Sequence, residues 1–194
     1  MNVRATRLKE VLDAVLANKD LEKSDVDGDG DLDTKCNLGA QIIAEAFDYY
    51  GFIVDGVKGP RGLMANEMMA LFEAEDRKHL DWSRWDNRSP EPDRGDWTEC
   101  DGKAACAAAG MGILVFAACY GPLVKAGGKT ARKSGHVAAV GAQGAMVYST
   151  KWGEECPVVA NIGQRNGYMG ANFAFASKPR YFIFIRNALG TPPG

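Results

Sequence analysis

The sequence lacks a long apolar run, an excess of charge of one sign and an apolar leader at its start. None of its apolar runs reaches the roughly 18 residues that a membrane-spanning helix requires, so we expect no transmembrane segment. The formal net charge of −2 gives no general attraction to nucleic acid or to anionic membranes. Residues 1–10 are charged along their length and hold no signal-peptide core. We therefore expect synthesis in the cytoplasm and, for any export, a route that needs no N-terminal signal.

Cysteine pairs with metal-site spacing are also missing. The five cysteines are Cys36, Cys100, Cys106, Cys119 and Cys156. They contain no CxxC pair, which argues against a zinc site. An odd count leaves one thiol over if the others pair, and the sequence does not fix the redox compartment. Disulfide-bonded and reduced states therefore both stay open.

The apolar pattern changes from helical to strand-like along the chain. Helical spacing occurs in residues 6–21, 36–50 and 64–78. Strand-like runs occur in residues 112–119, 136–140, 145–149, 158–162 and 181–186. Helices first and strands afterwards predict an α+β domain with N-terminal helices packed on an antiparallel sheet.

At 194 residues the chain suits one domain rather than two. We expect residues 1–24 to form an amphipathic helix packed on the domain, residues 25–190 to form the domain, and residues 191–194 to form a loose tail. Residues 79–103 are polar and aromatic without a period, which predicts a long irregular segment.

Residues 25–36 have the pattern of a calcium-binding loop, except at the last position. Carboxylates alternate along the segment, at Asp25, Asp27, Asp29, Asp31 and Asp33. Such a loop ends on a Glu that binds the ion through both oxygens, but Cys36 stands there, and a thiol is a poor ligand for a hard cation. The segment is either a calcium site of reduced affinity or a solvated acidic turn, and position 36 is free for another chemistry.

Cys36 begins a predicted helix, where backbone N–H groups and the helix dipole favour a thiolate. A thiolate nucleophile needs a base, and the chain has only two histidines. His79 lies among charged residues, whereas His136 follows Ser134-Gly135 and begins a short apolar strand. Each residue taken alone is more often structural than catalytic. The order of a helix Cys followed by a strand His is the layout of papain-like enzymes, so we select Cys36 and His136.

Four segments, taken in order, carry a family resemblance. They are Thr34-Lys35-Cys36-Asn37-Leu38, Lys103-Ala104-Ala105-Cys106 leading into residues 112–117, Ser134-Gly135-His136-Val137-Ala138-Ala139-Val140, and Val159-Ala160-Asn161-Ile162-Gly163. Together they resemble the NlpC/CHAP-type papain-like peptidoglycan hydrolases. Within that group they are most similar to the type VI secretion amidase effectors and related phage lytic enzymes.

The resemblance implies a papain-like fold and hydrolysis of an amide bond in the peptide stem of the bacterial cell wall. Cys36 is then the nucleophile. His136 is the base and afterwards the acid to the leaving amine, and backbone N–H groups at the helix start stabilise the oxyanion. Asn161 is expected to orient the imidazole, ahead of Gln164 and Asn166. A structural role in a turn is the alternative for Asn161.

The Asp-rich segment departs from the amidase effectors, whose lead into the nucleophile is short and polar. Some phage CHAP enzymes carry a calcium loop just before their Cys. A bound Ca²⁺ would fix the lead into the Cys36 helix and neutralise carboxylates that disfavour a nearby thiolate.

The partners that the resemblance implies are bacterial peptidoglycan and, for a secreted effector, an immunity protein. The place of action is then the periplasm or cell wall of a target cell after delivery. Two other hypotheses stay open. One is a non-enzymatic calcium-binding module in which Cys36 is inert, and the other is a papain-like hydrolase that acts on a protein substrate.

Overall fold

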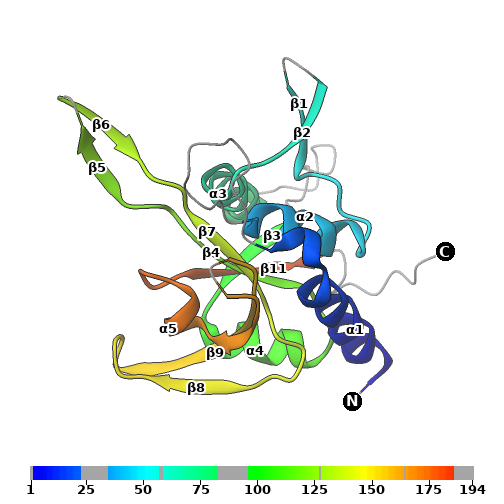
Figure 1. The fold of residues 1–194 in the computed structure, drawn as a ribbon. Coiled ribbons are helices and arrows are strands. Elements are labelled where there is room, and N and C mark those ends of the chain that lie inside the picture. Colours follow the sequence, from blue (N-terminus) through cyan, green and yellow to red (C-terminus); the bar gives the residue numbers. More distant parts are fainter. Residues whose placement is uncertain are drawn as a thin grey trace.

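The computed structural model of the chain describes residues 2–22, 35–56, 59–82, 96–126, 128–163 and 165–185. They form an α+β fold in which helices pack around a curled antiparallel sheet (Figure 1). The helices are α1 (Val3–Ala17), the 3-10 helix η1 (Lys19–Leu21), α2 (Cys36–Glu45), α3 (Ala65–Trp82), α4 (Gly102–Gly110) and α5 (Ala171–Ala174). The strands are β1 (Ile53–Gly56), β2 (Gly59–Gly62), β3 (Trp97–Cys100), β4 (Val115–Cys119), β5 (Leu123–Ala126), β6 (Lys129–Arg132), β7 (His136–Val140), β8 (Met146–Ser149), β9 (Glu154–Asn161), β10 (Gly167–Gly170) and β11 (Arg180–Phe184).

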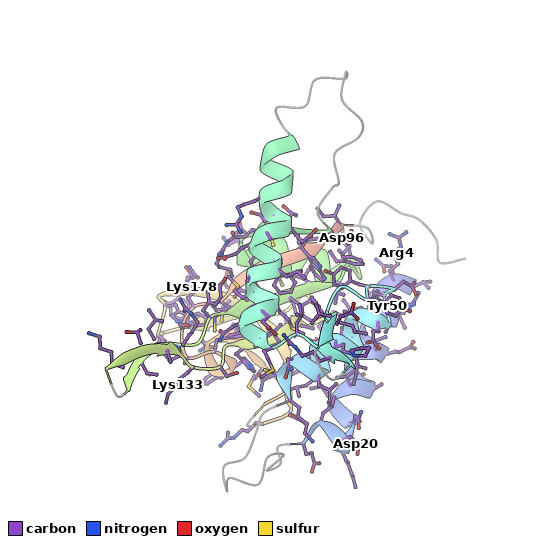
Figure 2. The ribbon with its side chains drawn as sticks, turned by 90° about the horizontal axis from the view of Figure 1, so that it is seen from above. Arg4, Asp20, Tyr50, Asp96, Lys133 and Lys178 are labelled. Atoms are coloured by element: carbon purple, nitrogen blue, oxygen red, sulfur yellow. The ribbon has the colours of Figure 1, made fainter. Side chains whose placement is uncertain are left out.

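The main sheet has seven strands in the order β10-β9-β7-β4-β11-β3, with β8 pairing β9 outside this path. Each pairing is antiparallel, as predicted. Two further hairpins, β1–β2 and β5–β6, stand apart from it. The β5–β6 hairpin projects from the body of the molecule between β4 and β7, and Lys133 follows it (Figures 1 and 2). Strands β4 and β7 therefore lie in the middle of the sheet, and the β5–β6 hairpin that connects them extends away from it.

The sheet is covered on both faces, by α3 on one side and α4 on the other (Figure 1). Alternate side chains of a strand point to opposite faces, and four of the five residues of β4 are buried. Beneath α3, the rings of Phe72 and Trp97 lie 4.9 Å apart, and Phe72 stacks on Phe182 at 4.8 Å. Such aromatic pairs stabilise by about 0.5–1.5 kcal/mol beyond their burial. This cluster fixes α3 to the sheet.

The expected N-terminal amphipathic helix is α1. Asn2 caps it by accepting a hydrogen bond from the Ala5 N–H at 2.8 Å. Its buried residues repeat every three or four positions, and they are Ala5, Leu8, Leu12 and Val15. This face packs against α2, α4 and β9.

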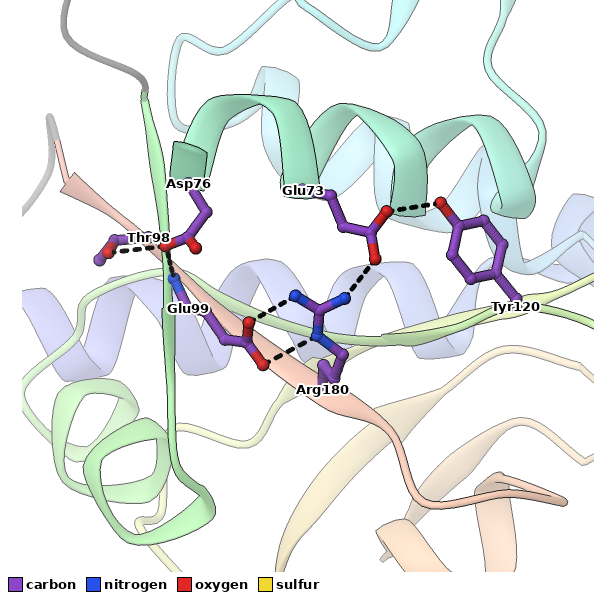
Figure 3. Close-up of polar contacts among 6 residues, drawn as sticks. All are labelled: Glu73, Asp76, Thr98, Glu99, Tyr120 and Arg180. Carbon is purple, nitrogen blue, oxygen red and sulfur yellow. Dashed lines mark hydrogen bonds and ion pairs between the residues drawn. The ribbon is translucent and has the colours of Figure 1, made fainter. Parts of the chain in front are cut away.

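An ion-pair cluster joins α3 to two strands (Figure 3). Arg180 of β11 binds Glu99 of β3 through Nε–Oε1 at 2.8 Å and Nη2–Oε2 at 2.5 Å, and its Nη1 also donates to Glu73 of α3. The Tyr120 hydroxyl donates to the other Glu73 oxygen at 2.8 Å. Asp76 of α3 accepts from the backbone N–H of Glu99 at 2.7 Å. The cluster holds the edge strand β3 in place.

The expectation of an irregular segment over residues 79–103 is wrong where the structure describes it. Helix α3 continues to Trp82, and β3 and the start of α4 lie within the segment. Trp97 is fully buried, which gives β3 a place in the core despite its polar neighbours. Asp101 caps α4 by accepting from the Ala104 N–H at 2.8 Å, and Ala-rich residues continue the helix. Residues 83–95 lie outside the described part.

Candidate active site

Cys36 is the first residue of α2, and its side chain is buried. Lys35 precedes it at the N-cap but makes no side-chain cap. The Lys35 ammonium donates instead to the Asp20 carbonyl oxygen at 2.8 Å, which ties the helix start to η1. The N–H groups of a first helical turn have no partner within the helix and carry a partial positive charge. The sulfur therefore lies at the positive end of α2.

His136 is the first residue of β7 and is paired with Cys119 of β4. A Cβ on the preceding Gly135 would lie 2.5 Å from the Cys119 carbonyl oxygen and 2.6 Å from Asn66 Oδ1. Only glycine therefore allows this approach of the chain to β4. The buried ring of Phe175 contacts the imidazole edge-on, with centroids 4.8 Å apart. The strand pairing therefore fixes the backbone of His136, and the contact with Phe175 restricts the rotation of its ring.

Asn161, the last residue of β9, is buried and orients the imidazole. Its Oδ1 lies 2.6 Å from His136 Nε2. Its Nδ2 donates to the Arg165 carbonyl oxygen at 2.6 Å. Because a carbonyl oxygen only accepts, this second bond assigns the NH₂ group to Arg165 and the amide oxygen to His136. Nε2 therefore donates its proton to Asn161, and Nδ1 is the nitrogen that stays available.

The side chains of Cys36 and His136 are hydrogen-bonded to each other. Since Nε2 is engaged with Asn161, Nδ1 is the nitrogen that faces the sulfur. Burial lowers the pKa of His136, but the hydrogen bond and the negative charge of Cys36, together with the bond to Asn161, outweigh it. The pKa of His136 is accordingly raised above its ordinary value. The structure brings the three predicted residues into one hydrogen-bonded row.

The other predicted candidates fall in two groups. Asn166 accepts from the Gly163 N–H at 3.1 Å and donates to the Leu21 carbonyl oxygen at 3.4 Å, so it braces the turn after β9. Gln164 lies outside the described residues, as does the side chain of His79. The predicted calcium ligands Asp25, Asp27, Asp29, Asp31 and Asp33 also lie outside them.

Within the ranges that the structure describes, no group of three or more His, Cys, Asp or Glu side chains is placed to hold a metal ion. All five cysteines lie in these ranges, and no disulfide joins them. Burial, aided by the charges of Asp101 and Glu99, raises the pKa of the Cys100 thiol to about 12. Burial also raises the pKa of Cys106. The raised pKa values keep both side chains as thiols, whereas a cysteine nucleophile reacts as a thiolate.

A cavity of about 460 Å³ adjoins the row of three residues. Its lining consists of His136, Asn161, Gly163, Arg165, Met169, Phe173 and Ala174. A larger hollow of about 980 Å³ lies between α4 and the ends of β3, β9 and β11, and none of the three site residues lines it. The smaller cavity is therefore the one that belongs to the candidate site.

Sequence reasoning gave no role to Phe175, Arg165 and Gly163, which contact the imidazole or its partner Asn161. A Cβ on Gly163 would lie 3.4 Å from His136 Cε1, so this glycine keeps the approach to the ring open. The sequence places all three after the predicted strand of residues 158–162, but nothing in their pattern marks them as neighbours of His136. Their proximity depends on how β10 and α5 fold back over β9.

Comparisons of this chain with models of known protein families, with curated proteins and with solved structures gave no match. In the described part of the chain, no helix combines the length and the apolar character needed to cross a membrane. The fold class shown is α+β.

Proposed function

We propose that this protein is a papain-like cysteine amidase or endopeptidase that hydrolyses an amide bond in the peptide stem of bacterial peptidoglycan. The observation that carries the proposal is the row Cys36–His136–Asn161, assembled from the start of α2, the start of β7 and the end of β9. Cys36 and His136 are about a hundred residues apart in the sequence, so their hydrogen bond is a property of the fold.

The geometry supports a two-step reaction. His136 Nδ1 takes the proton of the Cys36 thiol, and the thiolate attacks the amide carbonyl carbon. Backbone N–H groups at the start of α2 stabilise the resulting oxyanion. His136 then gives its proton to the departing amine, which leaves a thioester on Cys36. Water, deprotonated by His136, attacks the thioester, and the carboxylic acid and the thiol are released. Asn161 keeps the same imidazole nitrogen facing the sulfur throughout.

The substrate class rests on the sequence. The segments around Cys36, His136 and Asn161 resemble those of the peptidoglycan hydrolases named above, in the same order along the chain. The cavity beside His136, at about 460 Å³, has the size of a site for a few amino-acid residues. We propose, on the same resemblance, action on the cell wall of a target cell.

Calcium binding by the Asp-rich segment belongs to the same proposal. Alternating carboxylates suit Ca²⁺, and the segment leads directly into Cys36. A bound divalent cation would offset the negative charge beside the thiolate. If so, Ca²⁺ raises the melting temperature of the protein, a chelator lowers it, and the double variant Asp27→Asn/Asp29→Asn responds to neither. An equal response of wild type and variant contradicts a calcium site here.

The activity is tested by digesting purified peptidoglycan and identifying the released fragments by mass spectrometry. Wild type is expected to release fragments with one new amine and one new carboxyl end, and Cys36→Ala and His136→Ala are expected to release none. Cys106→Ala is the control, since this buried cysteine of α4 lies outside the site. Identical fragments from wild type and Cys36→Ala would refute the mechanism.

Alkylation gives a test that needs no substrate. With iodoacetamide at mildly acidic pH, Cys36 is expected to react faster than Cys100, whose pKa burial raises to about 12. Peptide mapping of the adducts measures both rates in one sample. Equal labelling of the two residues would favour an inert Cys36.

A further inference from the structure

The cavity beside His136 lies on one particular side of the candidate site. His136 and Asn161 line it, and Cys36 does not. The cavity therefore opens from the imidazole side of the Cys36–His136 pair rather than from the sulfur side. The side on which the cavity lies decides which half of the substrate it receives in the proposed reaction, and its assignment rests on that proposed function.

In the proposed reaction, cleavage of the amide bond gives an acyl half and an amine half, and each half lies next to a different residue of the Cys36–His136 pair. The acyl half becomes bonded to Cys36. The amine half receives the proton of His136, so its nitrogen must lie beside the imidazole when the bond breaks. The substrate residue on the amine side is then directed toward the cavity that His136 lines.

Arg165 gives this cavity its charge. Among the described residues of the lining it is the only Lys or Arg and there is no Asp or Glu, and its side chain is exposed. Among the described residues, no carboxylate pairs with Arg165. Its backbone is fixed to the site, because its carbonyl oxygen accepts the hydrogen bond of Asn161 Nδ2 at 2.6 Å. The backbone that carries this guanidinium is thereby held next to Asn161, the hydrogen-bond partner of the imidazole.

Apart from His136, Asn161 and Arg165, the described residues of the lining carry no polar side chain. Met169 of β10 and Phe173 and Ala174 of α5 form its apolar part, and Phe173 is 79% exposed. An apolar wall beside an exposed guanidinium suits a ligand that has a short hydrocarbon part and a carboxylate. A cationic or purely apolar ligand would leave Arg165 without a partner.

We propose that this cavity is the subsite for the amine-side residue of the substrate, that it selects a residue carrying a carboxylate, and that Arg165 is the specificity-determining side chain. Arg165 pairs with the carboxylate, and Phe173 and Met169 cover the aliphatic part. The substrate class is therefore an amide whose amine half bears a negative charge close to the scissile bond.

The test is a binding titration with inactive Cys36→Ala protein, which requires no turnover. The probes are two synthetic stem peptides, one with the amine-side carboxylate and one with a carboxamide in its place. We expect Cys36→Ala to bind the carboxylate peptide about 10- to 100-fold more tightly, the range of a hydrogen bond to a charged group. In Cys36→Ala/Arg165→Gln this preference disappears, because the affinity for the carboxylate peptide falls and that for the carboxamide peptide is unchanged.

Two controls make the outcome specific. Arg77→Gln removes one exposed positive charge of α3, outside the cavity, and is expected to leave the preference intact. Phe173→Ala is expected to weaken the binding of both peptides by the same factor, because Phe173 contacts the aliphatic part that the two peptides share. Equal affinity of the two peptides for Cys36→Ala, or a preference that persists in the Arg165→Gln protein, would overturn the subsite. Failure of the wild type to cut either peptide would overturn the proposed function, and the binding preference would still report on the cavity.

Discussion

Gly39 of α2 lies against Ile162 of β9 so closely that a Cβ on residue 39 would stand 2.1 Å from Ile162 Cδ1. Residue 162 directly follows Asn161, and residue 39 is one helical turn from Cys36. The contact therefore sets how near the start of α2 comes to the Asn161 end of β9. It links the position of the sulfur to that of the imidazole partner.

Gly39→Ala should destabilise the protein, although Ala is the better helix former by about 1 kcal/mol. The methyl group must displace Ile162 or α2, and such overpacking costs about 1–3 kcal/mol. Urea unfolding measures the loss, and activity should fall with it because Cys36 moves. Ile162→Val removes the Cδ1 atom that clashes, so the double variant Gly39→Ala/Ile162→Val is expected to recover part of the lost stability and part of the lost activity. A double variant no better than Gly39→Ala would show that the contact does not govern the site.

Asn161→Ala is expected to lower both the pKa of His136 and the turnover rate. The hydrogen bond from Asn161 is one of the interactions that raise this pKa, so its removal shifts the titration of His136 to lower pH. Cys36→Ala removes two contributions and should shift it further. NMR titration follows the imidazole signals, and His79→Gln assigns the one that belongs to His136. An unchanged pKa in Asn161→Ala would mean that the amide does not hold the ring.

Stability should fall with rising pH because of His136. Its pKa is raised in the folded protein above the ordinary value of 6.5, so the folded state binds this proton more tightly. The contribution is fully present below 6.5 and is lost as pH rises through the folded pKa. The free energy of unfolding, measured in urea from pH 5.5 to pH 9, should decline less steeply in His136→Gln than in wild type. Parallel curves would contradict the raised pKa.

Arg180→Ala is expected to destabilise the protein by about 1–2 kcal/mol, since two carboxylates lose a partner in an ordered cluster (Figure 3). The matched control is Lys178→Ala, which breaks a single exposed ion pair with Glu154 and should cost at most about 0.5 kcal/mol. Chemical denaturation measures both. A cost for Arg180→Ala no greater than the control would show that the cluster does not hold β3.

The elements that the sequence predicts correctly are those whose burial pattern is local. Residues 136–140 form an apolar run buried over four of its five positions, and β7 has the predicted bounds. The apolar repeat of the N-terminal segment likewise matches the buried face of α1. In both cases the apolar residues of the sequence pattern are the residues that the fold buries.

The missed elements depend on partners distant in sequence. Gly167–Gly170 has almost no strand pattern and becomes β10 through its pairing with β9. Trp97 lies in a polar stretch of the sequence, and only its packing against the rings beneath α3 explains why β3 forms there.

The candidate site shows the same division. The types and order of Cys36, His136 and Asn161 could be selected from sequence, because each belongs to a recognisable local setting. Their hydrogen bonds could not, because these depend on the amide orientation that Arg165 imposes from beyond the strand. Phe175 likewise reaches the imidazole only through the return of the chain after α5.

The β5–β6 hairpin divides the chain between the proposed nucleophile and its two partners. Among the described residues, no atom lies within 4 Å of a Cβ added to Gly128 near the hairpin tip, so a break in the backbone there is expected to disturb little packing. The fragment before the break holds Cys36 and β4, and the fragment after it holds His136, Asn161 and the strands β7 and β11 that flank β4. Neither fragment alone contains a complete site, and β4 would have to re-enter the gap between its neighbours to restore one. The protein is therefore suited to being split at this hairpin into two separately inert pieces, whose reassembly would be read out as regained hydrolysis.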